Sequence, residues 1–184
     1  MSGPPGVADI VARDPVALEQ LRAARALALP DWCIAAGFVR NRVWDHLHGI
    51  APPRPPADID LIYFDAADLS KDSEVAYERR LDALLPGLPW QVRNQARMHA
   101  WKNLPPHADT ADSMRYWLET VTAVGVRLEA DDRLTVVAAP LAVEDLLALR
   151  CRPTAFGRTR RGEYEARIAA KRWRALWPKV RFED

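Results

Sequence analysis

Short apolar runs alternate with amphipathic segments between residues 14 and 96, and this order constrains the fold more than any other feature of the sequence. Runs of this length that stop at Gly or Pro are typical of buried strands, whereas apolar residues at spacings of three and four indicate helices. Asp14-Pro15 begins the first helix, and Gly49 ends the second. The predicted order is helix 14–30, strand 32–36, helix 38–48, strand 58–64, helix 72–85 and strand 90–96.

The second half of the chain adds two more strands. The runs 124–129 and 134–138 flank an Asp131-Asp132 turn and should pair antiparallel. The helices expected around them are Ser113 to about Thr122, a short helix at 140–149 and a basic helix at 163–176. The pattern predicts an α/β (α+β) fold, a mixed sheet flanked by helices, in a single domain of residues 1–184.

Composition narrows the class of protein. The 184 residues include 26 Lys and Arg against 25 Asp and Glu. The chain therefore lacks the large positive surplus of a protein that coats nucleic acid or an anionic membrane through bulk charge alone. The sequence has no run of about 20 apolar residues and no signal peptide at its start, which predicts a cytoplasmic protein without a membrane partner. Cys33 and Cys151 match no metal-ligand spacing and are expected to be reduced, structural thiols.

Positive charge collects near the C-terminus. Arg150 to Arg181 contain 11 Lys and Arg and two acidic residues, whereas the preceding residues contain 15 and 21. The basic segment, about 150–184, is interpreted either as a solvated helix face or as a surface for RNA or nucleotide phosphate. The phosphate interpretation assigns this role to the cluster Arg160, Arg161, Lys171 and Arg172.

Asp58 and Asp60 are the strongest candidates for a functional site. Residues i and i+2 of a strand project to the same face, with Cα atoms about 6.5 Å apart. Two carboxylates so placed repel each other unless a cation binds. Mg²⁺ or Mn²⁺ prefers such oxygen ligands, and two such carboxylates can bridge the two ions of a phosphoryl-transfer site, which lie about 3.5–4 Å apart. The alternative is that Asp58 caps the preceding loop and Asp60 pairs with an arginine.

A companion site for phosphate is expected at the helix that follows the first strand. Gly37 allows close approach of the backbone, and a helix N-terminus presents free N–H groups to an anion. Arg40 adds a charged donor next to Asn41. An ordinary turn glycine is the alternative for Gly37.

Taken together, AAGFVRNRVWDHLHG at 35–49, DIDLIYFD at 58–65 and VRNQARMH at 92–99 resemble a bacterial family of uncharacterised nucleotidyltransferase-like proteins. That family belongs to the superfamily that also contains DNA polymerase beta. The resemblance continues through Glu119, Ala139 and Lys171 and covers most of the chain. It implies a mixed sheet flanked by helices, a glycine turn that holds a triphosphate, matched by Gly37, and a DxD strand that binds two Mg²⁺ ions, matched by Asp58 and Asp60.

Two departures from the superfamily pattern stand out. Its glycine is usually followed by Gly or Ser, whereas Gly37 is followed by Phe38. Its third carboxylate lies on a neighbouring strand, whereas the matching strand, 91–95, contains no acid; Asn94 and Gln95 are expected to line the nucleotide site instead. The remaining candidates for the third acid are Asp65, Glu119 and Asp145.

The resemblance implies Mg²⁺-dependent transfer of a nucleoside monophosphate from a nucleoside triphosphate to a hydroxyl of an RNA, a protein or a small molecule. Asp58 and Asp60 would be the catalytic, metal-binding residues, and Gly37, Phe38, Arg40, Asn41, Asn94 and Gln95 would contact the nucleotide. The alternatives are a noncatalytic nucleotide- or RNA-binding module that lost the third acid, and a plain interaction domain. The nucleobase, the acceptor and the oligomeric state stay open.

Overall fold

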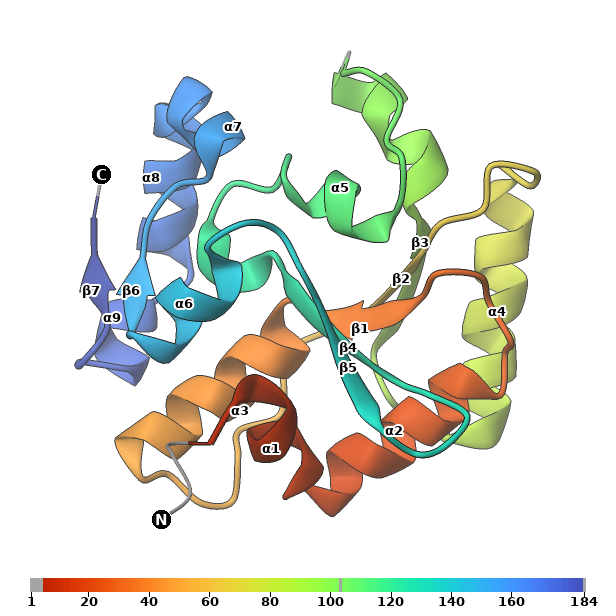
Figure 1. Ribbon diagram of the computed structural model, residues 1–184, viewed down its shortest axis with the longest axis horizontal. Helices are drawn as coiled ribbons and strands as arrows, with labels where there is room; N and C mark the ends of the chain where they lie inside the picture. Colours follow the sequence, from red (N-terminus) through yellow and green to blue (C-terminus); the bar gives the residue numbers. More distant parts are fainter. Residues whose placement is uncertain (1–4, 103, 184) are drawn as a thin grey trace.

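The computed structural model describes residues 5–102 and 104–183 (Figure 1). The helical elements in chain order are α1 Val7–Ala12, α2 Pro15–Arg25, α3 Gly37–His48, α4 Lys71–Leu84, η1 Gln95–Lys102, α5 Thr110–Met114, η2 Thr120–Thr122, α6 Ala142–Leu147, α7 Ala155–Thr159, α8 Arg161–Ala170 and α9 Trp173–Leu176. The strands are β1 Cys33–Ala35, β2 Ile59–Tyr63, β3 Trp90–Asn94, β4 Val124–Leu128, β5 Leu134–Ala138, β6 Arg150–Cys151 and β7 Arg181–Phe182.

Five strands form one mixed sheet in the order β3-β2-β1-β4-β5. β2 and β3 are parallel, and the other neighbours are antiparallel. The predicted mixed sheet flanked by helices is therefore confirmed, including the antiparallel pair β4 and β5. β6 and β7 form a separate parallel pair beside it.

The two faces of the sheet have different surroundings. Leu61 pairs with Ile34 of β1 and Val92 of β3, and all three are fully buried. Helix α4 covers this face, since the rings of Tyr63 and Tyr77 pack edge to face at 5.8 Å. On the opposite face, the strand partners of Asp60 are Ala35 and Gln91, and this face adjoins a cavity.

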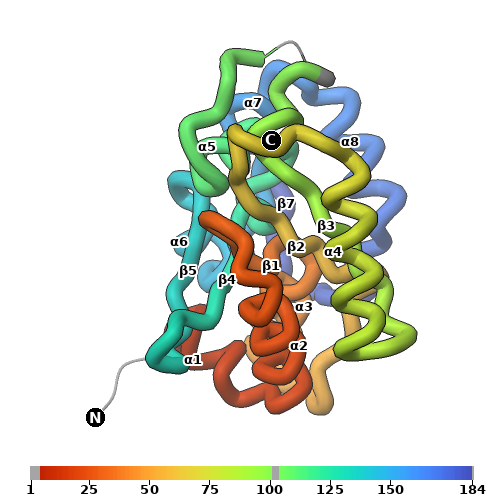
Figure 2. Tube along the Cα trace, turned by 90° about the vertical axis from the view of Figure 1, so that its right-hand side faces the viewer, coloured from red at the N-terminus to blue at the C-terminus, as the bar shows by residue number. Residues whose placement is uncertain are grey.

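The C-terminal elements lie beside α3, on the left in Figure 1, with α4 on the right. Figure 2 gives the view turned by 90°, with α1 and α2 at the lower end of the molecule. Trp173 and Trp177 pack against Trp44 of α3, with ring centroids 5.7 and 5.2 Å apart. No helix in the described part of the chain is both long enough and apolar enough to cross a membrane.

Several sequence-based boundaries are wrong. The expected helix from Ser113 to Thr122 is two short pieces, because Asp109 rather than Ser113 caps α5, accepting from the amide of Asp112 at 2.7 Å. The expected closing helix at 163–176 is divided into α8 and α9 by Arg172, whose φ is +53°. The first helix ends at Arg25 rather than near residue 30, and the pattern missed α1, η1, α7, β6 and β7.

Candidate functional site

Asp58 and Asp60 lie at the start of β2, next to the turn from β1 into α3. Asp58 directly precedes β2, and Asp60 is the strand partner of Ala35. Burial and, second to it, the charge of the neighbouring Asp58 raise the pKa of Asp60 to about 6, against the opposing effect of Arg167, Arg40 and Arg93. Among the residues described, the structure shows no hydrogen bond or ion pair to either carboxylate. The two acids form a local negative charge without a bound partner in the fold.

The N-terminus of α3 has free donors beside these acids. No side chain caps the helix, and the amide of its N-cap residue Ala36 donates to the carbonyl of Val124 at 3.0 Å. The amides of Gly37, Phe38 and Val39 belong to the first turn and have no acceptor within the helix. Such a terminus attracts anions through its N–H groups and its dipole.

Ala36 has the unusual backbone conformation in this turn. Its φ and ψ are +55° and −120°, a combination that favours glycine. A Cβ on Gly37 would meet Pro56 and Arg40 at 3.5 and 3.6 Å, which is ordinary van der Waals contact. Strained backbone of this kind concentrates at functional sites. The turn therefore requires the glycine-like geometry one residue earlier than the sequence predicts.

Arg40 lies close to Gly37 and is almost buried, at 7% exposure. Its Nη2 donates to Oδ1 of Asn41 at 2.8 Å, its Nε has no partner among the described residues, and its guanidinium stacks on Trp173 at 4.3 Å. Burial lowers the pKa of Arg40 to about 10, whereas the charges of Glu119 and Asp58 raise it. The structure thus places Arg40 and Asn41 near the N-terminus of α3, while the side chain of Phe38 is buried in the core.

A cavity of about 350 Å³ extends from Asp60 along the face of β2 and β3 that lies opposite α4. Residues from β1 to α8 line it: Ala36, Asp60, Ile62, Arg93, Gln95, Met98, Trp117, Leu118, Glu119, Thr122 and Arg167. Gly37, Arg40 and Asp58 do not line it. Ala36, the N-cap residue of α3, lines it together with Asp60, so the cavity begins beside the N-terminus of α3.

Of the three candidates for a third acid, only Glu119 lines this cavity. It is 1% exposed; its Oε1 accepts from Nε of Arg167 at 2.6 Å, and its Oε2 has no partner among the described residues. Asp145 pairs with Arg150 and Arg152, each at 2.8 Å, away from the cavity. The side chain of Asp65 accepts from the amide of Ala67 at 2.8 Å in the loop after β2.

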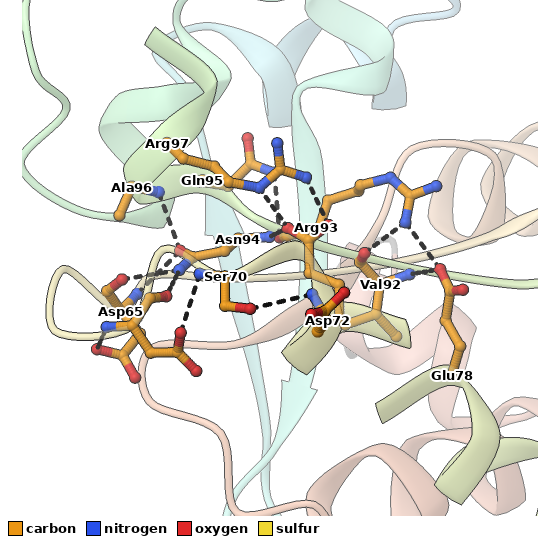
Figure 3. A network of polar contacts seen from close by, with 12 residues as sticks. Asp65, Ser70, Asp72, Glu78, Val92, Arg93, Asn94, Gln95, Ala96 and Arg97 are labelled. Carbon is orange, nitrogen blue, oxygen red and sulfur yellow. Dashed lines mark hydrogen bonds and ion pairs between the residues drawn. The ribbon is translucent and has the colours of Figure 1, made fainter. Parts of the chain in front are cut away.

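Asn94 is fully buried, and the fold uses all four hydrogen-bonding positions of its side-chain amide. Oδ1 accepts from the amides of Asp65 and Ala96 at 3.1 and 3.0 Å, and Nδ2 donates to the carbonyls of Asp65 and Asp68 at 2.7 Å (Figure 3). Asn94 thus fixes the loop after β2 and is not brought to the cavity. Its neighbour Gln95 does line the cavity, as expected for a contact residue.

The strand register identifies which residue faces Asp60 on β3. It is Gln91, a neutral amide, and the next pair along is Ile62 with Arg93. The described residues contain no group of three His, Cys, Asp or Glu side chains close enough to hold a metal ion. A cation at Asp58 and Asp60 would therefore need ligands from a bound phosphate or from water.

The C-terminal segment contributes to the site through a residue that the sequence analysis missed. Arg167 of α8 reaches Glu119 and lines the cavity, whereas the basic cluster Arg160, Arg161, Lys171 and Arg172 does not. Arg167 lies 48 positions from Glu119 in the sequence, so no local pattern relates them. Only their pairing in the fold reveals the contact.

The strand order and the turn from β1 into α3 place this chain in the class of nucleotidyltransferase folds. The family model described as "Nucleotidyltransferase" matches residues 22–182, and the chain belongs to this family. The predicted resemblance to a nucleotidyltransferase family within the DNA polymerase beta superfamily is confirmed. No match was found among curated proteins.

Solved structures share this fold. An NMR structure described as revealing a CCA-adding enzyme head domain is 30% identical, with a TM-score of 0.82, over 97% of this chain and 94% of that one. A CCA-adding enzyme in complex with CTP is 17% identical, with a TM-score of 0.61 over 98% of this chain. The Thermotoga maritima CCA-adding enzyme complexed with tRNA is also 17% identical, with a TM-score of 0.60 over 100% of this chain. This chain spans 44% of the length of each of the last two proteins.

Proposed function

We propose that this protein transfers a nucleoside monophosphate from a nucleoside triphosphate to an acceptor hydroxyl, with Mg²⁺ or Mn²⁺ as cofactor. One observation carries the proposal: the carboxylates of Asp58 and Asp60, which have no partner among residues 5–102 and 104–183, adjoin the N-terminus of α3, where no side chain of these residues caps the helix. Negative charge and free N–H donors side by side suit a complex of a cation and a polyphosphate. The family membership and the CTP complex of a similar fold support a nucleoside triphosphate as donor.

Asp58 and Asp60 fit a divalent cation because both supply oxygen ligands and a positive charge would relieve their mutual repulsion. When bound there, Mg²⁺ would neutralise phosphate charge and orient the triphosphate. The phosphate oxygens and water would complete its ligand set.

The residues of α3 would bind the β- and γ-phosphates. The amides of Gly37, Phe38 and Val39 would donate to phosphate oxygens, and Arg40, oriented by Asn41 and Trp173, would add positive charge. The acceptor oxygen forms a bond to the α-phosphorus as the bond from that phosphorus to the bridging oxygen breaks. Pyrophosphate leaves, and the proton of the hydroxyl passes to water. Positioning and charge stabilisation supply most of the catalysis in such a reaction.

A noncatalytic nucleotide-binding module is the second candidate, favoured by the pairing of Asp60 with Gln91 instead of an acid on β3. Glu119 is the described acid that lines the cavity with Asp60, and we assign it the role of the third carboxylate if the protein is catalytic. Loss of that acid would impair the chemistry more than nucleotide binding.

Pyrophosphate release separates the two candidates. Each of the four ribonucleoside triphosphates is incubated with Mg²⁺ and an RNA, a protein or a small hydroxyl compound, with Asp58→Asn as the control. Release that needs Asp58 supports the transferase. Metal-dependent nucleotide binding without release, across all acceptors, supports the binding module.

A further inference from the structure

The cavity next to Asp60 is lined by two arginines, which a nucleoside does not require. Arg93 of β3 and Arg167 of α8 both line the cavity, and the positive charge of each lowers the pKa of Asp60. The residues assigned to the triphosphate, Gly37 and Arg40, lie outside the cavity lining. Because a base and ribose are uncharged, the two arginines indicate a second ligand with its own anionic group.

Each arginine is held in place by a carboxylate and keeps further donors free. Nη1 of Arg93 donates to Oε1 of Glu78 at 2.7 Å (Figure 3), and Nε of Arg167 donates to Glu119 at 2.6 Å. The structure shows no partner, among the described residues, for Nε and Nη2 of Arg93 or for the terminal nitrogens of Arg167. A guanidinium has five N–H donors, so an arginine fixed at one edge can still bind an anion at the other.

Apart from the two arginines and the carboxylates of Asp60 and Glu119, the lining is apolar or neutral. Ile62, Met98, Trp117 and Leu118 provide an apolar wall, and the volume of about 350 Å³ suits one compact molecule. The ligand therefore combines an anionic group with an apolar or aromatic body.

We propose that this cavity binds the acceptor, a compact hydroxyl compound that carries a phosphate or a carboxylate. Arg93 and Arg167 bind its anionic group, and its reacting hydroxyl lies near Asp60. The assignment of this ligand as acceptor rests on the proposed transferase function. The anion site itself does not, since it requires neither metal nor nucleotide. Arg93 and Arg167 are then binding residues that determine specificity for the acceptor.

Phenyl phosphate is a suitable probe because it combines an aromatic ring with a phosphate. Its binding is measured by calorimetry and by amide NMR shifts in metal-free buffer, with inorganic phosphate and benzyl alcohol as the ringless and uncharged probes. We expect millimolar affinity, shifts at Gln95 and Thr122, and weaker binding of both control probes.

The variants test the arginines one at a time. Arg93→Gln and the double variant Arg167→Gln/Glu119→Gln, which leaves no unpaired buried carboxylate, should each weaken phenyl phosphate binding about tenfold or more. Arg133→Gln, on the exposed turn between β4 and β5, is the matched control and should bind as the wild type does. Equal binding by all variants, or binding of an RNA strand but not of phenyl phosphate, would overturn the proposal.

Competition with nucleotide then tests the assignment as acceptor. Saturating Mg²⁺ and ATP should leave phenyl phosphate bound, because Gly37 and Arg40, the residues assigned to the triphosphate, lie outside the lining of the cavity. Displacement would show that the nucleotide fills the cavity and would overturn the assignment. If phenyl phosphate binds through the arginines but no triphosphate binds with metal, the proposed function fails while the anion site stands.

Discussion

Replacing Asp60 by Asn should stabilise the metal-free protein at neutral and alkaline pH. Burial and the charge of Asp58 raise the pKa of Asp60 from 3.8 to about 6, so the folded state favours the protonated acid. That favourable contribution is fully present below about pH 3.8 and is lost as pH rises through about 6. Because Asn is uncharged like the protonated acid, the variant should keep this favourable contribution to stability at every pH.

The magnitude follows from the pKa difference. One pKa unit corresponds to about 1.4 kcal/mol, so Asp60→Asn should raise the free energy of unfolding by about 3 kcal/mol at pH 8. By the same linkage, Asp60→Asn should raise the free energy of unfolding by only about 1 kcal/mol at pH 4.5. For a domain of this size, the difference at pH 8 corresponds to an increase in Tm of roughly 6–12 °C.

Urea unfolding of both proteins in EDTA at pH 8 and pH 4.5 measures this difference. Asp131→Asn, at an exposed turn, is the control and should stay within about 0.5 kcal/mol of the wild type. The reasoning is refuted if Asp60→Asn is no more stable than the wild type at pH 8, or if its advantage is unchanged at pH 4.5. Added Mg²⁺ should stabilise the wild type but not the variant.

Four further outcomes follow from the same geometry. Metal-dependent nucleotide affinity, measured by calorimetry, should fall about tenfold between pH 7.5 and pH 5, because protons compete for Asp60 through its pKa of about 6; a pH-independent affinity would contradict this. Ala36→Gly should raise the free energy of unfolding by about 1 kcal/mol in urea, since glycine relieves the positive φ of Ala36; a loss of stability would count against strain there. Gly125→Ala should cost roughly 2–3 kcal/mol, because its Cβ would come within 2.5 Å of Sγ of Cys33, and the added change Cys33→Ala should restore part of the loss; no restoration would exclude this clash as the cause. Gln91→Glu should strengthen Mg²⁺ binding several-fold by placing an acid opposite Asp60, and an unchanged calorimetric affinity would contradict the register argument.

Local pattern was enough to predict the mixed sheet. The strand period of two also predicted that Asp58 and Asp60 share one face; in the structure Asp58 directly precedes β2 and lies close enough to raise the pKa of Asp60. The turn glycine was assigned to Gly37, whereas the glycine-like geometry belongs to Ala36. Residue type indicated the turn, but only the dihedral angles show which residue carries the strain.

Contacts between distant segments were beyond the reach of sequence pattern. Glu119 was one of several acids, and its place in the cavity that Asp60 also lines depends on how the chain returns to the sheet after α5. Arg167 was counted as one charge of a basic segment, yet it alone of the C-terminal arginines lines the cavity. The stacking of Trp173 on Arg40 likewise depends on the break in the closing helix at Arg172.

Calorimetric titration with each nucleoside triphosphate, with and without Mg²⁺, tests the central claim most directly when the wild type is compared with Asp58→Asn and Asp60→Asn. We predict that at least one triphosphate binds the wild type only in the presence of metal, and that each substitution removes this metal-dependent binding. Binding that is the same in both variants, or no binding of any of the four by the folded wild type, would contradict the account.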